Sequence, residues 1–405
     1  MNYLITGGGF GNKGAEAMTL TAIYNISAHD DQAHIYMFKG IVEPAFELKK
    51  PVQYIYCYQW LFLYILGRSM RGYRWIAFKD IIKTIVPGYA QREGNVIRSY
   101  RAIKSIDYLI DISGYGFGSK WSDDNNQDWL DWLNVASKYA KKKYLMPQSF
   151  GPLDFEKVEL CEYAKMVFKR FDHIYAREES SAEYLSQLGI NSEMMADSVL
   201  IERDYDPSRI IGRYEDYREV IEINNSKNIA IIPNMRLIDR GGLNEDSIID
   251  FYQVVIEKYV GKYDIYLIAH SDEDLELCRR IKERNTMDNR VICVDHVLYS
   301  FNYETFIGKM DFIIASRYHS IVHAYKEYIP AVIIGWADKY QSLAKSVEQE
   351  SYIIRLERIG LRDSLSIVDD MEQNYAVESS VIRQNVLNLQ EKTCYGFLED
   401  DRKEW

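Results

Sequence analysis

The residues best suited to chemistry in this 405-residue chain are an arginine and a histidine two positions apart, Arg317 and His319, in the segment SRYHS. An apolar run at 312–315 comes before them and a helical pattern at 320–327 follows, so both are expected near the first turn of a helix. There the unpaired amides, the positive end of the helix dipole and the guanidinium of Arg317 favour a phosphate or carboxylate. The imidazole would lie within reach for proton transfer, although a histidine that only packs in the fold is the alternative.

Other polar residues follow apolar runs in the second half of the chain. Arg236 comes after the run at 229–233 and is expected to supply a second cation, and His270 comes directly after the run at 265–269. Because ligands of open α/β sheets bind outside the carboxyl ends of the strands, these residues indicate a cleft between two facing domains. Neither His270 nor His296 has a metal-like spacing to another candidate ligand, so no metal site is predicted.

The first loop, residues 7–14, reads GGGFGNKG and formally matches the pattern GxGxxG between a strand and a helix. A dinucleotide site also needs an acid after the second strand, but residues 37–40 (MFKG) contain none, so NAD is not expected. A Walker motif is excluded because Gly14 follows Lys13. Two alternatives are left: the amides of this turn hold an anion or a sugar, or the turn simply needs positive φ.

Asp111 ends a very apolar run and precedes a segment, 113–118 (SGYGFG), that the sequence predicts to be a flexible loop. A carboxylate in such surroundings is costly without a partner. Asp111 is therefore expected to be either a hydrogen-bonded loop anchor or a base, and both alternatives stay open at this point.

Apolar runs alternate with amphipathic segments along nearly the whole chain, which predicts an α/β protein with parallel sheets. Strands are expected at 3–6, 34–38, 53–57, 108–112, 143–146, 173–176, 193–196, 229–233, 265–269, 291–295, 312–315, 331–334 and 352–355. Helices are expected at 15–27, 125–140, 155–169, 180–188, 247–259, 273–284, 303–309, 320–327 and 379–391. The polar segment 203–228 is expected to link two Rossmann-like domains, at 1–202 and 229–405.

The composition limits the class of protein. Asp and Glu total 60 against 49 Lys and Arg, a formal net charge of -11, so no basic surface for nucleic acid is expected. The five cysteines are scattered without a CxxC pair, which indicates buried thiols in a reducing compartment. No signal peptide or membrane-spanning stretch is recognisable, so a cytoplasmic location is predicted.

A basic and aromatic insert at about 58–92 is the exception in this acidic chain. From Trp60 to Arg92, six lysines and arginines accompany a single acid, Asp80, among many aromatic side chains. A basic amphipathic segment of this kind can lie on an anionic membrane surface, which would place the protein peripherally at the inner face of the membrane. The alternative is an insert that packs over the cleft and serves anionic substrates.

Several separated motifs, in order, resemble the polysaccharide pyruvyl transferase family. They are Gly11-Asn12-Lys13-Gly14-Ala15-Glu16-Ala17, Asp111-Ile112-Ser113-Gly114, Pro147-Gln148-Ser149-Phe150-Gly151-Pro152, Ala176-Arg177-Glu178-Glu179-Ser180, Ala196-Asp197-Ser198 and Ser316-Arg317-Tyr318-His319. The resemblance spans roughly residues 2–340. It implies a GT-B-like pair of Rossmann-like domains facing across a cleft, and transfer of a pyruvyl group from phosphoenolpyruvate to a sugar as a ketal.

By this resemblance, Arg317 and His319 match the family's Arg-x-His site, and Arg236 resembles a second donor-binding arginine. The expected site residues are, for catalysis, His319 and Asp111; for the donor, Arg317, Arg236, Ser316, Ser320 and His270; and for the acceptor, Gly9, Gly11, Asn12, Ser113, Gly114, Tyr115 and Gln148. No cofactor is required, since phosphoenolpyruvate is itself the donor. One departure is Ala15, which stands where the family usually has an acid; this puts an acidic role there in doubt, and Glu16 is the neighbouring candidate.

The acceptor implied by the resemblance is a sugar of a surface polysaccharide or of its lipid-linked precursor. Two other functions stay open. A nucleotide-sugar-dependent glycosyltransferase of the same architecture would need a ribose-binding acid in the second domain, for which Glu304 is the candidate. A non-catalytic glycan-binding or scaffold protein would have no need of an arginine and a histidine together at a helix N-terminus.

Overall fold

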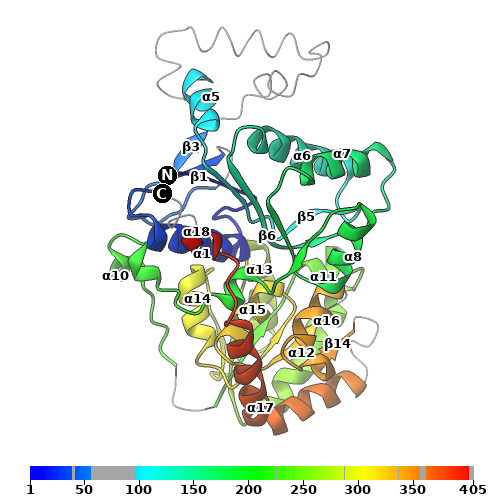
Figure 1. The fold of residues 1–405 in the computed structure, drawn as a ribbon. Helices are drawn as coiled ribbons and strands as arrows, with labels where there is room; N and C mark the ends of the chain where they lie inside the picture. Colours follow the sequence, from blue (N-terminus) through cyan, green and yellow to red (C-terminus); the bar gives the residue numbers. More distant parts are fainter. Residues whose placement is uncertain are drawn as a thin grey trace.

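The computed structural model describes residues 1–38, 42–55, 96–223, 227–239, 241–286, 288–335, 337–355 and 362–400. This part of the chain forms two parallel sheets, each with helices packed on it. In the view of Figure 1, the domain that contains the first sheet lies above the domain that contains the second. The predicted α/β class is confirmed. The basic insert predicted at about 58–92 lies outside the described residues, so both hypotheses about it stay predictions.

The first sheet has eight strands in the order β3-β2-β1-β4-β6-β7-β8, with β5 pairing with β6. The strands are β1 (Asn2–Thr6), β2 (His34–Phe38), β3 (Gln53–Ile55), β4 (Tyr108–Asp111), β5 (Tyr115–Phe117), β6 (Lys142–Phe150), β7 (His173–Ala176) and β8 (Glu193–Met194). The helices are α1 (Lys13–His29), α5 (Val96–Lys104), α6 (Asp123–Ser137), α7 (Glu159–Phe168), α8 (Glu179–Gln187) and α9 (Ser198–Ile201). The short elements η1 (Pro207–Arg209) and α10 (Tyr214–Tyr217) follow.

The second sheet has six strands in the order β11-β10-β9-β12-β13-β14. The strands are β9 (Asn228–Ile232), β10 (Asp264–Leu267), β11 (Val291–Cys293), β12 (Phe312–Ala315), β13 (Ala331–Ile334) and β14 (Ile353–Ile354). The helices are α11 (Arg236–Asp239), α12 (Glu245–Tyr259), α13 (Asp272–Glu283), α14 (Ser300–Ile307), α15 (Tyr318–Lys326), α16 (Asp338–Lys345), α17 (Arg362–Leu389) and α18 (Phe397–Asp400), with η2 (Glu350–Tyr352) before β14.

In both sheets the strand order reverses at the first strand of the domain. β1 lies between β2 and β4, and β9 lies between β10 and β12. The connections from neighbouring strands therefore run to opposite faces and open a crevice at the carboxyl ends of the strands. The glycine-rich loop and Asp111 follow β1 and β4, whereas Arg236 and Arg317 follow β9 and β12.

The segment 113–118 is not the flexible loop that the sequence predicts. Tyr115 and Phe117 pair with Ser149 and Phe150 of β6, so the segment contains the strand β5. Three glycines within six residues carry no strand signal, because glycine has no side chain to pack. Pairing with a strand more than 30 residues away decides the conformation here.

The chain returns to the first domain at its end. The helix predicted at 379–391 is part of α17, which begins at Arg362 and buries Val368 and Met371 in the core of the second domain. After α17 the chain crosses back, and the ring of Phe397 in α18 stacks on Tyr144 of β6 with centroids 3.7 Å apart. The C-terminal segment thus contacts both domains.

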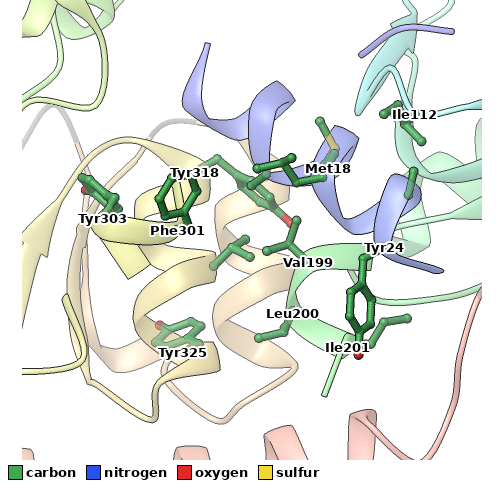
Figure 2. Close-up of a cluster of buried hydrophobic side chains, with 14 of the residues drawn as sticks. Met18, Tyr24, Ile112, Val199, Leu200, Ile201, Phe301, Tyr303, Tyr318 and Tyr325 are labelled. Atoms are coloured by element: carbon green, nitrogen blue, oxygen red, sulfur yellow. The ribbon is translucent and has the colours of Figure 1, made fainter. Parts of the chain in front are cut away.

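Helices of both domains also share one buried apolar cluster, drawn in Figure 2. α1 and α9 come from the first domain, and α14 and α15 from the second. Its members include Met18, Val199, Leu200, Phe301, Tyr318 and Tyr325. Each buried side chain of this size contributes ~1.5–3 kcal/mol relative to exposure, so this cluster holds the domains in a defined arrangement.

Candidate functional site

His319 of the second domain reaches the glycine-rich loop of the first. It is the second residue of α15 and lies two positions after the N-cap Arg317. A Cβ atom at Gly14, in the first turn of α1, would lie 2.2 Å from Nδ1 of His319. Only glycine leaves room for the imidazole at this position, so the loop and the histidine meet across the domain boundary.

The imidazole of His319 is neutral in the free protein and lacks a full set of partners. Its Nε2 atom is buried and makes no hydrogen bond to a described residue, and it lies 3.8 Å from the Asp197 carboxylate, which is too far for a hydrogen bond. Burial, followed by the positive charges of Arg177, His323 and Lys339, lowers the pKa of His319 well below its usual value. A buried ring nitrogen without a partner is a natural contact for a ligand atom.

The two arginines predicted for the donor lie together, on either side of Glu273. Arg236 Nη2 is 2.9 Å from one oxygen of Glu273, and Arg317 Nη2 is 2.8 Å from the other. Arg317 also pairs with the fully buried Asp274 and donates to Ser271 Oγ, whereas Arg236 pairs with Asp239. The sequence therefore predicted their proximity, but it missed the carboxylates that occupy both guanidiniums.

His270 lies at the carboxyl end of β10 and is only 2% exposed. Neither ring nitrogen has a hydrogen-bond partner among the described residues. Burial and then the charges of Arg317 and His319 lower the pKa of His270 well below its usual value, so it is a neutral group next to the two predicted site residues.

Ser316 and Ser320 are both fully buried. The Ser316 carbonyl accepts from the Asn234 amide and the Tyr340 hydroxyl, at 2.8 and 2.9 Å. The Ser320 hydroxyl accepts from Tyr303, at 2.8 Å. These bonds position the loop before α15, and a donor contact by either serine stays a prediction.

Arg177, at the end of β7, contributes a cation from the first domain. Its guanidinium donates to Asp197 at 2.8 Å, to Ser149 Oγ at 2.9 Å and to the Gly114 carbonyl at 3.0 Å. The same guanidinium lies over the ring of Tyr318, 4.2 Å from its centroid. The sequence places Arg177 at a strand end, but it does not indicate a role for this residue.

A cleft of about 650 Å³ opens beside Tyr318. The first domain lines it with residues of β5, with the end of β6 and with the segments that follow β5, β6 and β7, and the second domain lines it with the start of α16. The lining residues are Tyr115, Lys120, Trp121, Ser149, Phe150, Gly151, Pro152, Glu178, Ser180, Tyr184, Ala337, Asp338 and Lys339. The cleft therefore lies between the two domains, as predicted, although the apolar cluster of Figure 2 fills the other side of the same boundary.

Lys339 is the basic residue of the second domain in this cleft. Its ammonium lies 5.2 Å from the centroid of the Tyr318 ring, so Tyr318 carries one cation from each domain. Burial, followed by the charge of Arg177, lowers the pKa of Lys339 to about 8. Lys339 makes no ion pair with any residue of the described part of the chain. The charge of Glu178 acts in the opposite direction without forming an ion pair, and a half-buried ammonium of this kind favours an anionic ligand.

The polar residues predicted in the first domain are mostly satisfied by the fold. Asp111 is 1% exposed, and its carboxylate accepts from Thr6 Oγ1, from the amide and hydroxyl of Ser113, and from Gln148 Nε2. Burial raises the pKa of Asp111 to about 6 in spite of these bonds. This geometry fits the loop-anchor alternative, and Asp111 does not line the cleft.

The glycine-rich loop also uses its polar groups internally. Asn12 is the N-cap of α1 and accepts from the amides of Gly14 and Ala15. The Gly9 amide donates to Thr19 Oγ1, and Gly11 approaches Val42. Of the predicted acceptor residues, Tyr115 lines the cleft and the others do not, so their predicted acceptor contacts gain no support from this geometry.

Most residues of this boundary fall within one sequence match, which ends one residue before Lys339. The chain matches the polysaccharide pyruvyl transferase family over residues 12–338, most of its length and from Asn12 to the neighbour of Lys339. The chain belongs to this family. No curated protein matches the chain.

Solved structures show how this pyruvyl transferase family member is built. A UDP-GlcNAc 2-epimerase from Methanocaldococcus jannaschii is similar with a TM-score of 0.50 and 12% identity, over 91% of this chain and 92% of that one. The spinosyn rhamnosyltransferase SpnG is similar with a TM-score of 0.50 and 8% identity, over 100% of both chains. At these identities the likeness concerns the fold alone, and it confirms the predicted GT-B-like architecture.

The departure from the family pattern at Ala15 has a structural counterpart in its neighbour. Glu16 is 1% exposed; it accepts from Lys13 Nζ at 2.8 Å and from the Ser300 amide at 2.7 Å. Glu16 therefore caps α14 across the domain boundary and does not face the cleft.

The described residues show neither a metal-binding cluster nor a membrane-spanning helix. They contain no group of three or more histidine, cysteine, aspartate or glutamate side chains arranged to hold a metal ion. Their helices are all too short or too polar to cross a membrane.

Proposed function

We propose that this family member transfers a pyruvyl group from phosphoenolpyruvate to a sugar of a polysaccharide or of its precursor, forming a pyruvate ketal. The single observation that carries the proposal is the pair of cations on Tyr318. Arg177 and Lys339 come from different domains, and the residue after Tyr318 is His319, whose Nε2 has no hydrogen-bond partner among the described residues. An anion bound there would lie beside a group able to move protons.

The donor carries a carboxylate and a phosphate, so its site needs two cationic parts. Lys339 and Arg177 form one part of the proposed site, and Arg317 with Arg236 forms the other. Arg317 directly precedes Tyr318 in the chain, which brings the two parts close together. Glu273 is 38% exposed in its side chain, so it can move aside when an anion takes its place between the arginines.

The reaction proposed for this site moves two hydroxyl protons. The methylene carbon of the donor takes a proton, and the adjacent carbon becomes electrophilic. One sugar hydroxyl attacks that carbon; a second hydroxyl of the same sugar then displaces phosphate and closes the ketal ring. One of the two hydroxyl protons thus corresponds to the proton gained by the new methyl group, and the other leaves with phosphate.

His319 is the residue proposed to move these protons. The negative charge of the bound donor favours the imidazolium, which is the form that protonates the methylene carbon. The neutral imidazole that results, which is also the form favoured in the free protein, then accepts the proton of the attacking hydroxyl. Asp111 was predicted as an alternative base, and Asp111→Asn tests that role separately.

A nucleotide-sugar glycosyltransferase is the second candidate, because the solved structures with this fold include a rhamnosyltransferase. The acid suggested for its ribose site is already engaged. Glu304 lies 2.7 Å from His323 Nδ1 and 3.0 Å from Lys326 Nζ. Burial by itself raises the pKa of Glu304, but Lys326 and His323 outweigh it, and the pKa falls to about 2. The Glu304 carboxylate therefore belongs to an internal ion cluster, which argues against its contact with a ribose.

One assay separates the candidates. The full-length protein is incubated with a mixed set of galactosides and with either phosphoenolpyruvate or a UDP-sugar. Phosphate release that requires both phosphoenolpyruvate and an acceptor supports pyruvyl transfer. UDP release supports the glycosyltransferase, and release of neither product favours a non-catalytic glycan-binding protein.

A further inference from the structure

The cleft beside Tyr318 is lined by two chemically different groups of side chains. One group is cationic and comprises Lys339 and Lys120; the charge of Arg177 also acts on Lys339. The other group consists of three aromatic side chains of the first domain, Tyr115, Trp121 and Tyr184. The anionic donor accounts for the cationic group and leaves the aromatic group without an assigned ligand.

The three aromatic rings are held in place by their neighbours. The Tyr115 hydroxyl donates to the Gly151 carbonyl at 2.9 Å, and the Trp121 indole N–H donates to the Tyr115 carbonyl at 3.3 Å. Tyr115 and Trp121 also face each other with ring centroids 6.1 Å apart.

Tyr184 is fixed by a different contact. Gly151 has a φ of +78°, and a Cβ atom there would lie 2.1 Å from the Tyr184 ring, so only glycine admits the ring. All three aromatic side chains are half-buried and keep part of their surface toward the cleft. Rigid rings of this kind bind a ligand without the cost of ordering flexible side chains.

We propose that Trp121, Tyr184 and Tyr115 form the acceptor subsite and hold a neutral pyranose ring of the polysaccharide, with Glu178 and Asp338 available to its hydroxyl groups. The apolar C–H face of a pyranose matches an aromatic ring, and its hydroxyls match carboxylate oxygens at the rim. A volume of about 650 Å³ has room for a sugar in addition to the small donor. The role of the sugar as the acceptor rests on the proposed pyruvyl transfer, whereas the binding of a sugar at this subsite does not depend on it.

The subsite is tested by Trp121→Ala and Tyr184→Ala in the full-length protein. Each variant is expected to raise the KM for the sugar acceptor about tenfold or more, because it removes an aromatic side chain that is proposed to contact only this substrate. The KM for phosphoenolpyruvate is expected to change less than about twofold. Trp121→Phe keeps an aromatic face and should restore most of the acceptor affinity.

Tyr139→Ala is the matched control. Tyr139 is also half-buried and packs edge-to-face on Tyr100, but it does not line the cleft. It should leave both KM values unchanged, and thermal unfolding of each variant shows whether the fold is kept. A folded Trp121→Ala protein with an unchanged acceptor KM would overturn the proposal.

Direct binding separates this proposal from the proposed reaction. Saturation-transfer NMR is carried out with methyl galactoside, methyl glucoside and methyl mannoside, and with uridine monophosphate as the nucleotide alternative. Pyranoside binding that depends on Trp121 supports the subsite even if phosphate release from phosphoenolpyruvate is absent. Trp121-dependent binding of the nucleotide alone, or no binding of any pyranoside at millimolar concentration, would overturn it.

Discussion

The two sides of the domain boundary differ in packing and in the pairing of their charged groups. On one side, side chains of α1, α9, α14 and α15 fill the space between the domains (Figure 2). There the Glu304 carboxylate lies within 3.0 Å of both Lys326 Nζ and His323 Nδ1. On the other side, a cleft lined by Lys339 stays open, and nearby, outside the lining of that cleft, His319 Nε2 has no hydrogen-bond partner among the described residues.

The contrast separates a structural boundary from a binding one. Buried charges are tolerated in a fold only when they are paired. We therefore interpret the filled side as a fixed contact that sets the angle between the domains. The open side leaves a cation and an imidazole incompletely satisfied, at a cost that a bound anion would offset. Variants on the filled side should therefore change stability, and variants on the open side should change catalysis.

The largest effect is expected for His319→Ala on the open side. Turnover, measured as acceptor-dependent phosphate release, should fall by about 10²- to 10⁴-fold, because the variant lacks the group proposed to move protons. The free energy of unfolding should change little, since Nε2 makes no hydrogen bond in the described structure. His29→Ala, far from the cleft at the end of α1, is the control. Near-normal turnover of His319→Ala would remove the acid–base role.

The next effect concerns the filled side. Glu304→Gln should lower the free energy of unfolding by about 3–5 kcal/mol, because it leaves the ammonium of Lys326 buried without a counter-ion. Denaturant unfolding measures the change, and Glu222→Gln, at an exposed position, is the control. A change below about 1 kcal/mol would show that the cluster does not hold the boundary.

The same cluster predicts a dependence of stability on pH. The pKa of Glu304 is about 2 in the folded protein against a usual value of 4.5, so the folded state favours the charged form. The charged Glu304 therefore contributes about 3 kcal/mol to the free energy of unfolding. This contribution is complete above about pH 4.5 and is lost as the pH falls through about 2. Glu304→Gln should lack this acid-dependent loss; identical acid profiles for both proteins would contradict it.

On the open side, Lys339 should limit activity at high pH. Its pKa of about 8 means that the cationic form decreases above that pH, so kcat/KM for phosphoenolpyruvate should fall about fivefold from pH 8 to pH 9. Lys339→Arg keeps the charge throughout this range and should move the decline to higher pH. A decline that stays in place in Lys339→Arg would assign it to another group.

The smallest effect is expected at Glu273. Glu273→Gln should lower the KM for phosphoenolpyruvate about threefold, because it removes a partly exposed carboxylate that competes with the donor for Arg236 and Arg317. Glu276→Gln, on the same helix but paired with Arg279 and Arg280, should have no such effect. A higher KM in Glu273→Gln would mean that the carboxylate supports donor binding.

Much of the site follows from one rule about strand ends. The rule led to Arg317, Arg236 and His270, and the structure places all three at the carboxyl ends of neighbouring strands. Applied once more, it would have indicated Lys339, which follows β13 by five residues. Trp121 and Tyr184 carried no comparable signal, because aromatic residues in amphipathic segments are usually core.

The sequence by itself determined the class and most of the elements, although β5 and α16 were not predicted. Runs of apolar residues specify buried parallel strands locally, which is why β12 and β13 begin and end where the pattern predicts. Only the tertiary structure decided which groups meet: the imidazole of His319 against Gly14, Arg177 and Lys339 on one Tyr318 ring, and β5 beside β6. These contacts join residues far apart in the chain, and side-chain periodicity contains no information about which distant surfaces pack together.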